Sequence, residues 1–211
     1  NMTVLWHPEL PAGFKEFCAK VSIDTSSVQY ENDSLMRKVR GCDDYGIACC
    51  VSYQAIGKSI QFFGARANLA KALLLALNGG RCENTGTLMV EGIKPLSSDV
   101  LDFDEVMDNY KKVMHEVARV YNETMNIIHF MHDKYDYEKS QMAFIDTDPK
   151  INLAYGVAGL SIVADSLAAI KHAKVTARRN ADGLTEGFNI EGDFPKFGND
   201  DDRVDLIAKD M

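Results

Sequence analysis

The sequence lacks an excess of basic residues and has no long apolar run. Asp and Glu together number 31 against 23 Lys and Arg, which gives a formal net charge of −8. Binding to nucleic acid depends on many cations that neutralise phosphates, so this balance argues against a nucleic-acid-binding protein. No apolar stretch reaches the roughly 18 residues of a membrane-spanning helix, and no basic segment followed by an apolar one opens the chain. We therefore expect neither a membrane span nor a signal peptide.

The cysteines are few, and none are paired at the spacing of a metal site or a disulfide framework. They are Cys18, Cys42, Cys49, Cys50 and Cys82. An odd number at irregular spacing, without a CxxC motif, favours reduced thiols in a cytosol-like compartment. His129 and His132 are spaced i,i+3 beside Asp133, which gives too few ligands for a metal site. The sequence thus predicts no bound metal.

The apolar content is sufficient for one sizeable core, because 46% of the 211 residues are apolar. Short extended runs are expected at 21–23 and 28–30, followed by a polar loop at 31–44. A strand or tight loop is expected at 45–51. From about residue 59 the apolar spacing predicts a helix, and Asn78-Gly79-Gly80 is a signal for its end.

The second half of the sequence predicts two further helices and a strand. Asp102 and Glu105 have the spacing of N-cap and N3 residues, so a long helix with one apolar stripe should follow. A third helix is expected at about 157–174, then a strand around Phe188 and Ile190 and a polar turn at 200–202. Strands that alternate with long helices predict an α/β fold.

The adjacent cysteines Cys49 and Cys50 are the most informative feature of the sequence. Zinc-binding cysteines are separated by two to four residues so that the chain can surround the ion. A disulfide between neighbouring residues is strained, because one trans peptide holds their Cα atoms only ~3.8 Å apart. The doublet is therefore either a buried coincidence or a site whose chemistry needs two sulfur atoms in contact.

Arg66 follows the doublet within a segment of aromatic and small residues that reads as a buried helix. Burying a guanidinium group is costly unless it is paired, and its planar fork suits a carboxylate. The spacing alone allows two interpretations of Arg66. It forms an internal ion pair, or it holds a small carboxylate substrate beside the thiols.

The segments 45–52 and 61–71, which contain the doublet and Arg66, closely resemble the pyruvate formate-lyase family of glycyl radical enzymes. Further blocks in the same order match this family along the whole chain. These blocks are 21–27, 132–135, 156–161, 165–167, 173–175 and 191–195. A Cys-Cys doublet distinguishes this branch from glycyl radical diol dehydratases and decarboxylases, which carry a single catalytic cysteine.

The resemblance implies a fold and an activity. Residues 1–211 would form part of a single catalytic domain, as a segment of a ten-stranded α/β barrel with long outer helices. The activity would be that of a formate C-acetyltransferase, which converts pyruvate and coenzyme A to acetyl-coenzyme A and formate in anaerobic glucose fermentation. By the same resemblance, Cys50 relays a radical to Cys49, which becomes acetylated. Arg66 would bind the pyruvate carboxylate, and Phe63 would form an aromatic wall of the pocket.

The resemblance also implies the partners. The glycyl radical would come from a C-terminal loop and be generated by a radical SAM activating enzyme, so no cofactor is expected to bind this segment itself. Coenzyme A is the co-substrate, although its contacts cannot be assigned to particular residues. The full-length protein would be a homodimer without nucleic-acid or membrane partners. Its location would be cytoplasmic, or organellar in a eukaryote.

The sequence also departs from the family pattern. Tyr53-Gln54 follows Val51-Ser52, where members of the family have Pro-Met. The radical-bearing motif Arg-Val-Ser-Gly-Tyr does not occur, since Arg203-Val204 is followed by Asp205. The N-terminal half of the family's domain is missing as well. We therefore expect the chain to be an internal segment that is inactive in isolation.

Three alternatives remain open at this point. The first is 2-ketobutyrate as substrate, because one methylene changes binding by only ~1–3 kcal/mol. The second is a non-catalytic thiol protein in which an exposed Cys49 of low pKa senses oxidants. The third is a gene remnant that folds poorly, in which unpaired strand edges and apolar faces would cause aggregation.

Overall fold

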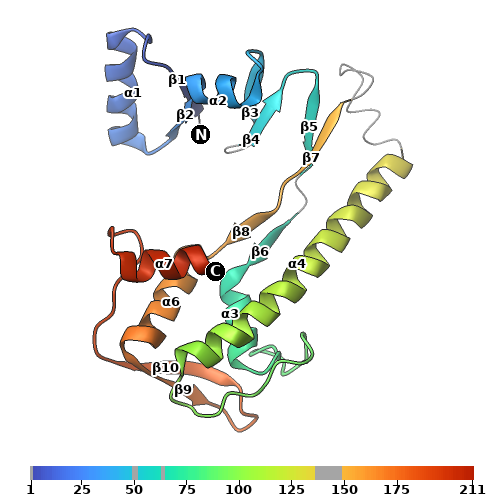
Figure 1. The fold of residues 1–211 in the computed structure, drawn as a ribbon, viewed down its shortest axis with the longest axis vertical. Coiled ribbons are helices and arrows are strands. Elements are labelled where there is room, and N and C mark those ends of the chain that lie inside the picture. Colours follow the sequence, from blue (N-terminus) through green and yellow to red (C-terminus); the bar gives the residue numbers. More distant parts are fainter. Residues whose placement is uncertain (1, 49–51, 63–64, 136–148) are drawn as a thin grey trace. The chain divides into compact units, whose positions relative to one another are not determined.

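The computed structural model describes residues 2–48, 52–62, 65–135 and 149–211 (Figure 1). The chain divides into two compact units. The first unit consists of Asn1–Phe63 and His129–Ala154, and the second consists of Gly64–Ile128 and Tyr155–Met211. Cys49, Cys50 and Phe63 lie outside the described residues. None of the described helices is both long enough and apolar enough to cross a membrane.

The first unit begins with a β-α-β arrangement. Strand β1 (Met2–Trp6) pairs in parallel with β2 (Val28–Asn32), and Met2 lies opposite Val28. Helix α1 (Ala12–Thr25) connects the two strands. The extended run predicted at 21–23 is therefore wrong, because these residues form the last turns of α1. Parallel strands need a long crossover, and this requirement overrides the β-propensity of Val21 and Ile23.

A second helix, α2 (Asp33–Arg40), occupies most of the loop predicted at 31–44. The side chain of Asn32 caps it by accepting a hydrogen bond from the backbone N–H of Leu35 at 3.0 Å. Basic residues gather in its last turn, where they complement the helix dipole, and Gly41 ends it in the left-handed conformation. The prediction was wrong because the polar composition of this segment hid its helical caps.

Four short strands complete the first unit. Strand β3 (Tyr45–Ala48) pairs antiparallel with β4 (Ser52–Ala55). Strand β5 (Ser59–Phe62) pairs in parallel with β7 (Lys150–Leu153). The strand predicted in the first part of 45–51 is thus confirmed for Tyr45–Ala48.

In the second unit, β6 (Arg66–Asn68) pairs in parallel with β8 (Gly156–Ala158), and each strand is followed by a helix. These helices are α3 (Leu69–Leu77) and α6 (Leu160–His172). The helix predicted from residue 59 is wrong in its first part, because β5 and β6 precede α3. An apolar run does not by itself distinguish a buried strand from a helix. Here the side chain of Asn68 caps α3 by accepting from the backbone N–H of Lys71 at 3.0 Å.

The long helix α4 (Phe103–Lys134) confirms the predicted cap, since the carboxylate of Asp102 accepts from the backbone N–H of Glu105 at 2.9 Å. Its N-terminal half contributes Val106, Tyr110 and Val113 to the core of the second unit, where they are fully buried. The predicted stripe does not continue along the whole helix, because Val120 is 46% exposed. Leu73 of α3 is buried in the same core.

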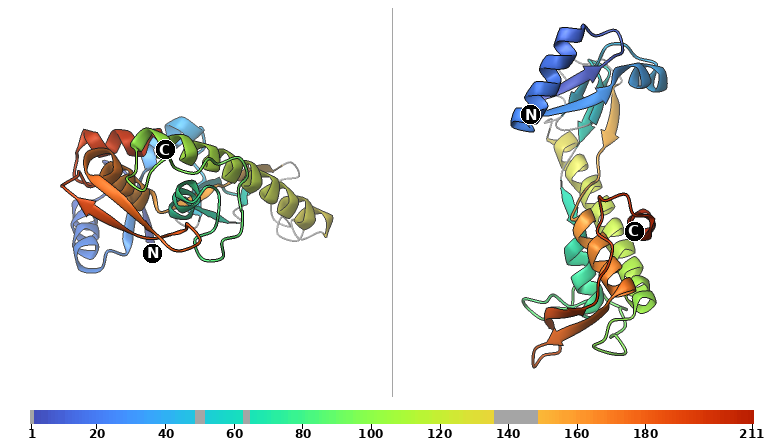
Figure 2. Two further views of the ribbon diagram at one scale, coloured as in Figure 1. Left: turned by 90° about the horizontal axis from the view of Figure 1, so that it is seen from below. Right: turned by 90° about the vertical axis from the view of Figure 1, so that its left-hand side faces the viewer.

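The C-terminal part of the second unit consists of a hairpin and a short helix. Strand β9 (Lys174–Arg179) pairs antiparallel with β10 (Thr185–Glu191), which confirms the strand predicted around Phe188 and Ile190. Helix α7 (Asp202–Asp210) starts within the predicted polar turn, and Asp201 is its N-cap. Helix α6 packs against α7 and β9 (Figure 2).

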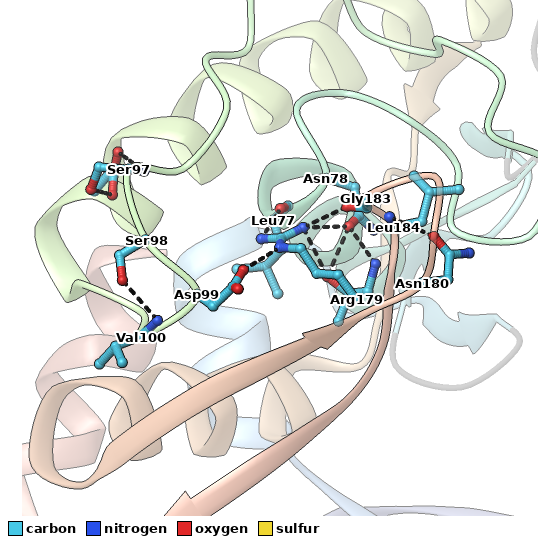
Figure 3. A network of polar contacts seen from close by, with 12 residues as sticks. Leu77, Asn78, Ser97, Ser98, Asp99, Val100, Arg179, Asn180, Gly183 and Leu184 are labelled. Atoms are coloured by element: carbon cyan, nitrogen blue, oxygen red, sulfur yellow. Dashed lines mark hydrogen bonds and ion pairs between the residues drawn. The ribbon is translucent and has the colours of Figure 1, made fainter.

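A polar network joins this hairpin to the end of α3 (Figure 3). Asn78, which ends α3, accepts from the backbone N–H and the hydroxyl of Thr185 at 3.0 and 2.8 Å. The guanidinium of Arg179 donates to Asp99 at 2.9 Å and to the Leu77 carbonyl at 3.2 Å. The predicted helix end at Asn78-Gly79-Gly80 is confirmed. Gly80 is required there, because its φ is +81° and an added Cβ would lie 1.9 Å from the Val90 carbonyl oxygen.

The strands of the described ranges form five two-stranded sheets and no closed barrel. The mixed α/β content agrees with the predicted fold class. The ten-stranded barrel is not seen in this segment and stays a prediction for a longer polypeptide.

Candidate active site

The cysteine doublet lies between two strands of a hairpin whose arms are well defined. Ala48, the last residue of β3, pairs directly with Ser52, the first residue of β4. At the other end of the hairpin, Tyr45 pairs with Ala55. Because Cys49 and Cys50 are outside the described residues, the site is described from the residues that support them.

The base of the hairpin is fixed to α2 by a buried polar cluster. The hydroxyl of Tyr45 donates to the carboxylate of Asp33 at 2.7 Å, and the Nε of Arg37 donates to the same carboxylate at 2.9 Å. The hydrogen bond from Tyr45 is the main reason that the pKa of Asp33 is lowered. Burial, followed by the bond to Asp33, raises the pKa of Tyr45 to about 12. Sequence reasoning missed this cluster because it treated 31–44 as a loop.

Tyr53, one of the departures from the family pattern, has a clear structural role. Its ring stacks on that of Tyr45, with ring centroids 5.2 Å apart and planes inclined by 27°. The guanidinium of Arg40 lies 5.2 Å from the centroid of the same ring. The aromatic side chain therefore stabilises the hairpin through packing in a position where the family pattern has proline.

A second set of contacts ties β4 to β5 beside the doublet. The amide of Gln61 donates to the hydroxyl of Ser52 at 2.7 Å, and the backbone N–H of Ala55 donates to the hydroxyl of Ser59 at 2.9 Å. Ser52 directly follows the masked segment. The residue that leads out of the doublet is thus held by a side chain of the neighbouring strand.

His129 and His132 pack against an aromatic ring in the first unit. Their rings lie 5.8 and 5.1 Å from that of Phe62, which ends β5. Within the described ranges, no group of three or more His, Cys, Asp and Glu side chains is arranged to hold a metal ion. The two histidines are therefore best interpreted as packing residues.

Arg66 differs from its sequence-based description. It is the first residue of strand β6, pairs with Gly156 of β8, and is exposed. The expectation of a guanidinium buried on a helix is wrong, because α3 begins only at Leu69. Arg66 belongs to the second unit, whereas the hairpin of the doublet belongs to the first.

The backbone around Arg66 is held by Tyr121 of α4. Its hydroxyl donates to the carbonyl of Ala65 and accepts from the backbone N–H of Gly156 at 3.1 Å. The ring of Tyr121 also makes an edge contact with Tyr155, with centroids 5.0 Å apart. One phenol thus bridges the starts of both strands of the β6–β8 pair, which fixes the backbone from which Arg66 projects.

Comparison with known proteins extends over the whole chain. The sequence profile of the family described as pyruvate formate lyase-like matches residues 1–211. The chain is 55% identical over all 211 residues to formate acetyltransferase 1 of Escherichia coli (strain K12), and it spans 28% of that relative's length. With a match that covers every residue, this chain belongs to the pyruvate formate lyase-like family.

Proposed function

We propose that this chain is the thiol-bearing segment of a formate C-acetyltransferase, which converts pyruvate and coenzyme A to acetyl-coenzyme A and formate. The observation that carries the proposal is the 55% identity to a formate acetyltransferase along the entire chain. The Cys49-Cys50 doublet and Arg66 fall within this matched region. Because the chain spans 28% of that relative, the activity belongs to the larger protein.

The two thiols would divide the work between them. A glycyl radical on another part of the protein supplies the initial hydrogen abstraction. Cys50 loses the hydrogen of its thiol and recovers it from Cys49, and adjacent residues suit this exchange because their Cα atoms are ~3.8 Å apart. The sulfur radical of Cys49 attacks the carbonyl carbon of pyruvate. The carbon–carbon bond then breaks homolytically, and Cys49 retains the acetyl group as a thioester.

The described residues support a doublet held on a firm base. The Tyr45–Asp33 bond, the Tyr45–Tyr53 stack and the Gln61–Ser52 bond restrain the hairpin on both sides of the thiols. Such restraint is useful because covalent catalysis depends on accurate positioning of the reacting sulfur. Coenzyme A would then accept the acetyl group from Cys49.

Arg66 would bind the pyruvate carboxylate, with Phe63 as an aromatic wall of the pocket. A guanidinium can make two parallel hydrogen bonds to one carboxylate. The exposure of Arg66 on β6 supports this role more than that of an internal ion pair. One additional methylene in the substrate has a small energetic effect, so 2-ketobutyrate remains an alternative substrate.

The remaining features are proposed for the full-length protein. It would complete the ten-stranded barrel, carry the radical loop, form a homodimer in the cytoplasm and depend on a radical SAM activating enzyme. The segment without these parts would be inactive.

The test uses the full-length protein, activated under anaerobic conditions. We expect Cys49→Ser and Cys50→Ser each to abolish formate production from pyruvate, with Cys42→Ser as a matched control that retains it. Only variants with an intact Cys49 should accumulate an acetyl thioester at that position. Formate production by Cys49→Ser would overturn the proposal. The ratio of kcat/KM for pyruvate and 2-ketobutyrate decides the preferred substrate.

A further inference from the structure

A second cysteine environment with defined chemistry lies in the second unit, away from the doublet. The Nζ of Lys71, in the first turn of α3, is 3.1 Å from the Sγ of Cys82. The same Nζ forms an ion pair with the carboxylate of Glu83. A nucleophilic sulfur, an amine and a carboxylate from two different segments thus meet at one point.

The environment of Cys82 favours the thiolate. Hydrogen bonds from the hydroxyl of Thr85, from Lys71 and from the backbone N–H groups of Asn84 and Thr85 lower the pKa of Cys82 to about 7. The turn that aims these groups at the sulfur is closed by a 2.8 Å bond from the N–H of Gly86 to the Cys82 carbonyl. A substantial fraction of this thiol is therefore ionised at neutral pH, which makes it susceptible to oxidation.

The position of Lys71 shows that its partners matter. The first turn of a helix disfavours a positive charge, because the helix dipole presents its positive end there. Burial would lower the pKa of Lys71, but hydrogen bonds to Glu83 and Cys82 outweigh it and the pKa is raised. Glu83 also offers a carboxylate that can take a proton from Nζ. The side chains of Lys71 and Glu83 are 31% and 17% exposed, so the cluster is open to small oxidants.

We propose that Lys71 and Cys82 form an oxygen-sensitive pair that becomes covalently cross-linked through a single bridging oxygen atom, Sγ–O–Nζ. Dissolved dioxygen is the oxidant. The thiol loses its hydrogen and the amine loses one of its hydrogens, and both leave as water with one oxygen atom, while the other oxygen joins sulfur to nitrogen. Sulfur and nitrogen each give up two electrons, and dioxygen takes up all four. Sulfur and nitrogen already lie at hydrogen-bond distance, so the bridge needs only a small closing movement.

The cross-link would fix the turn at 82–87 to the beginning of α3. Because β6 runs directly into α3, it would also restrain the segment that carries Arg66. The inference itself is independent of the proposed catalytic function, since it concerns only the Lys71–Cys82 pair.

The test uses the full-length protein without activation, so that catalysis plays no part. It is purified under anaerobic conditions, divided, and one half is exposed to dissolved oxygen before digestion without reductant. We expect a linked pair of peptides containing Lys71 and Cys82, with a mass about 14 Da above their sum, in the oxidised half only. Dithiothreitol should separate them.

Variants assign the atoms. Lys71→Arg keeps the positive charge but should abolish the cross-link, and Cys82→Ser should abolish it as well. Cys42→Ser, which removes a partly exposed thiol of the first unit, should leave it unchanged. The peptide map of the unmodified protein decides the matter even where a variant folds poorly. A Cys82 that stays reduced, or that reaches sulfinic acid or a mixed disulfide with Lys71 unmodified, would overturn the proposal.

Discussion

The hydroxyl of Tyr45 donates a 2.7 Å hydrogen bond to the carboxylate of Asp33, and this bond joins the hairpin of the cysteine doublet to helix α2. Both residues are buried, with 7% and 8% of their surfaces exposed. A buried hydrogen bond to a charged group contributes more than an ordinary one, so the pair should determine how firmly β3 is held.

Tyr45→Phe removes this bond and leaves the rest of the ring in place. We expect the backbone amides of Tyr45–Ala48 to exchange with deuterium at least about tenfold faster, because such a bond contributes about 1.5–3 kcal/mol. Tyr135→Phe changes an exposed tyrosine of the first unit and is the matched control. Unchanged exchange in β3 would show that packing alone holds the strand.

The thiol of Cys82 should react with iodoacetamide in a pH-dependent manner, with half-maximal rate near its pKa of about 7. Since this pKa is lowered from 9.0, the thiolate stabilises the folded state above pH 9, and this contribution is lost as the pH falls through 7. Lys71→Gln should move the midpoint upward, because it removes the ammonium group. Alkylation of the Cys82 peptide, followed by mass spectrometry, measures this midpoint. An equal midpoint in both proteins would contradict a role for Lys71.

Arg66→Lys in the activated full-length protein should raise the KM for pyruvate by about 10- to 100-fold, because lysine cannot make the two parallel hydrogen bonds of a guanidinium. The kcat should change much less if Arg66 only binds the carboxylate. Arg81→Lys, at another exposed arginine of the second unit, is the control. A fall in kcat at constant KM would argue against carboxylate binding.

Gly80 and Gly92 offer a matched pair of substitutions. Both have positive φ, at +81° and +77°, but only at Gly80 would a Cβ collide with backbone, whereas nothing lies within 4 Å at Gly92. Gly92→Ala should cost about 1–2 kcal/mol for the left-handed conformation alone. Gly80→Ala should cost clearly more, because the Val90 carbonyl must also move. Melting temperatures of the two variants test the difference, and equal values would exclude the collision.

The sequence predicted the features that are determined by local chemistry. The cap formed by Asp102, the end of α3 at Asn78 and the strand around Phe188 depend on neighbouring residues, and all three are confirmed. Helix α1 was mistaken for a strand at Val21–Ile23 because the crossover between β1 and β2 is not visible in local propensity. The same limitation applies to β5 and β6, whose pairing partners lie far along the chain.

The candidate site shows a similar division. The doublet is conspicuous in the sequence, but its roles came only from the family resemblance. Asp33 and Tyr45 are twelve residues apart, and only the recognition of Asn32 as a helix cap could have suggested that they meet. Lys71 and Cys82 are eleven residues apart on either side of a helix end, so no local pattern relates them.

The two-stranded sheets have a consequence for the way this polypeptide associates. A strand with one neighbour has a full row of main-chain donors and acceptors directed outward, and a pair of strands is only marginally stable in water. Each described pair is therefore a template onto which another strand can add. The β1–β2 and β3–β4 pairs are half-built in this sense, and whichever extended segment reaches them first determines whether the outcome is a completed molecule or an assembly of copies.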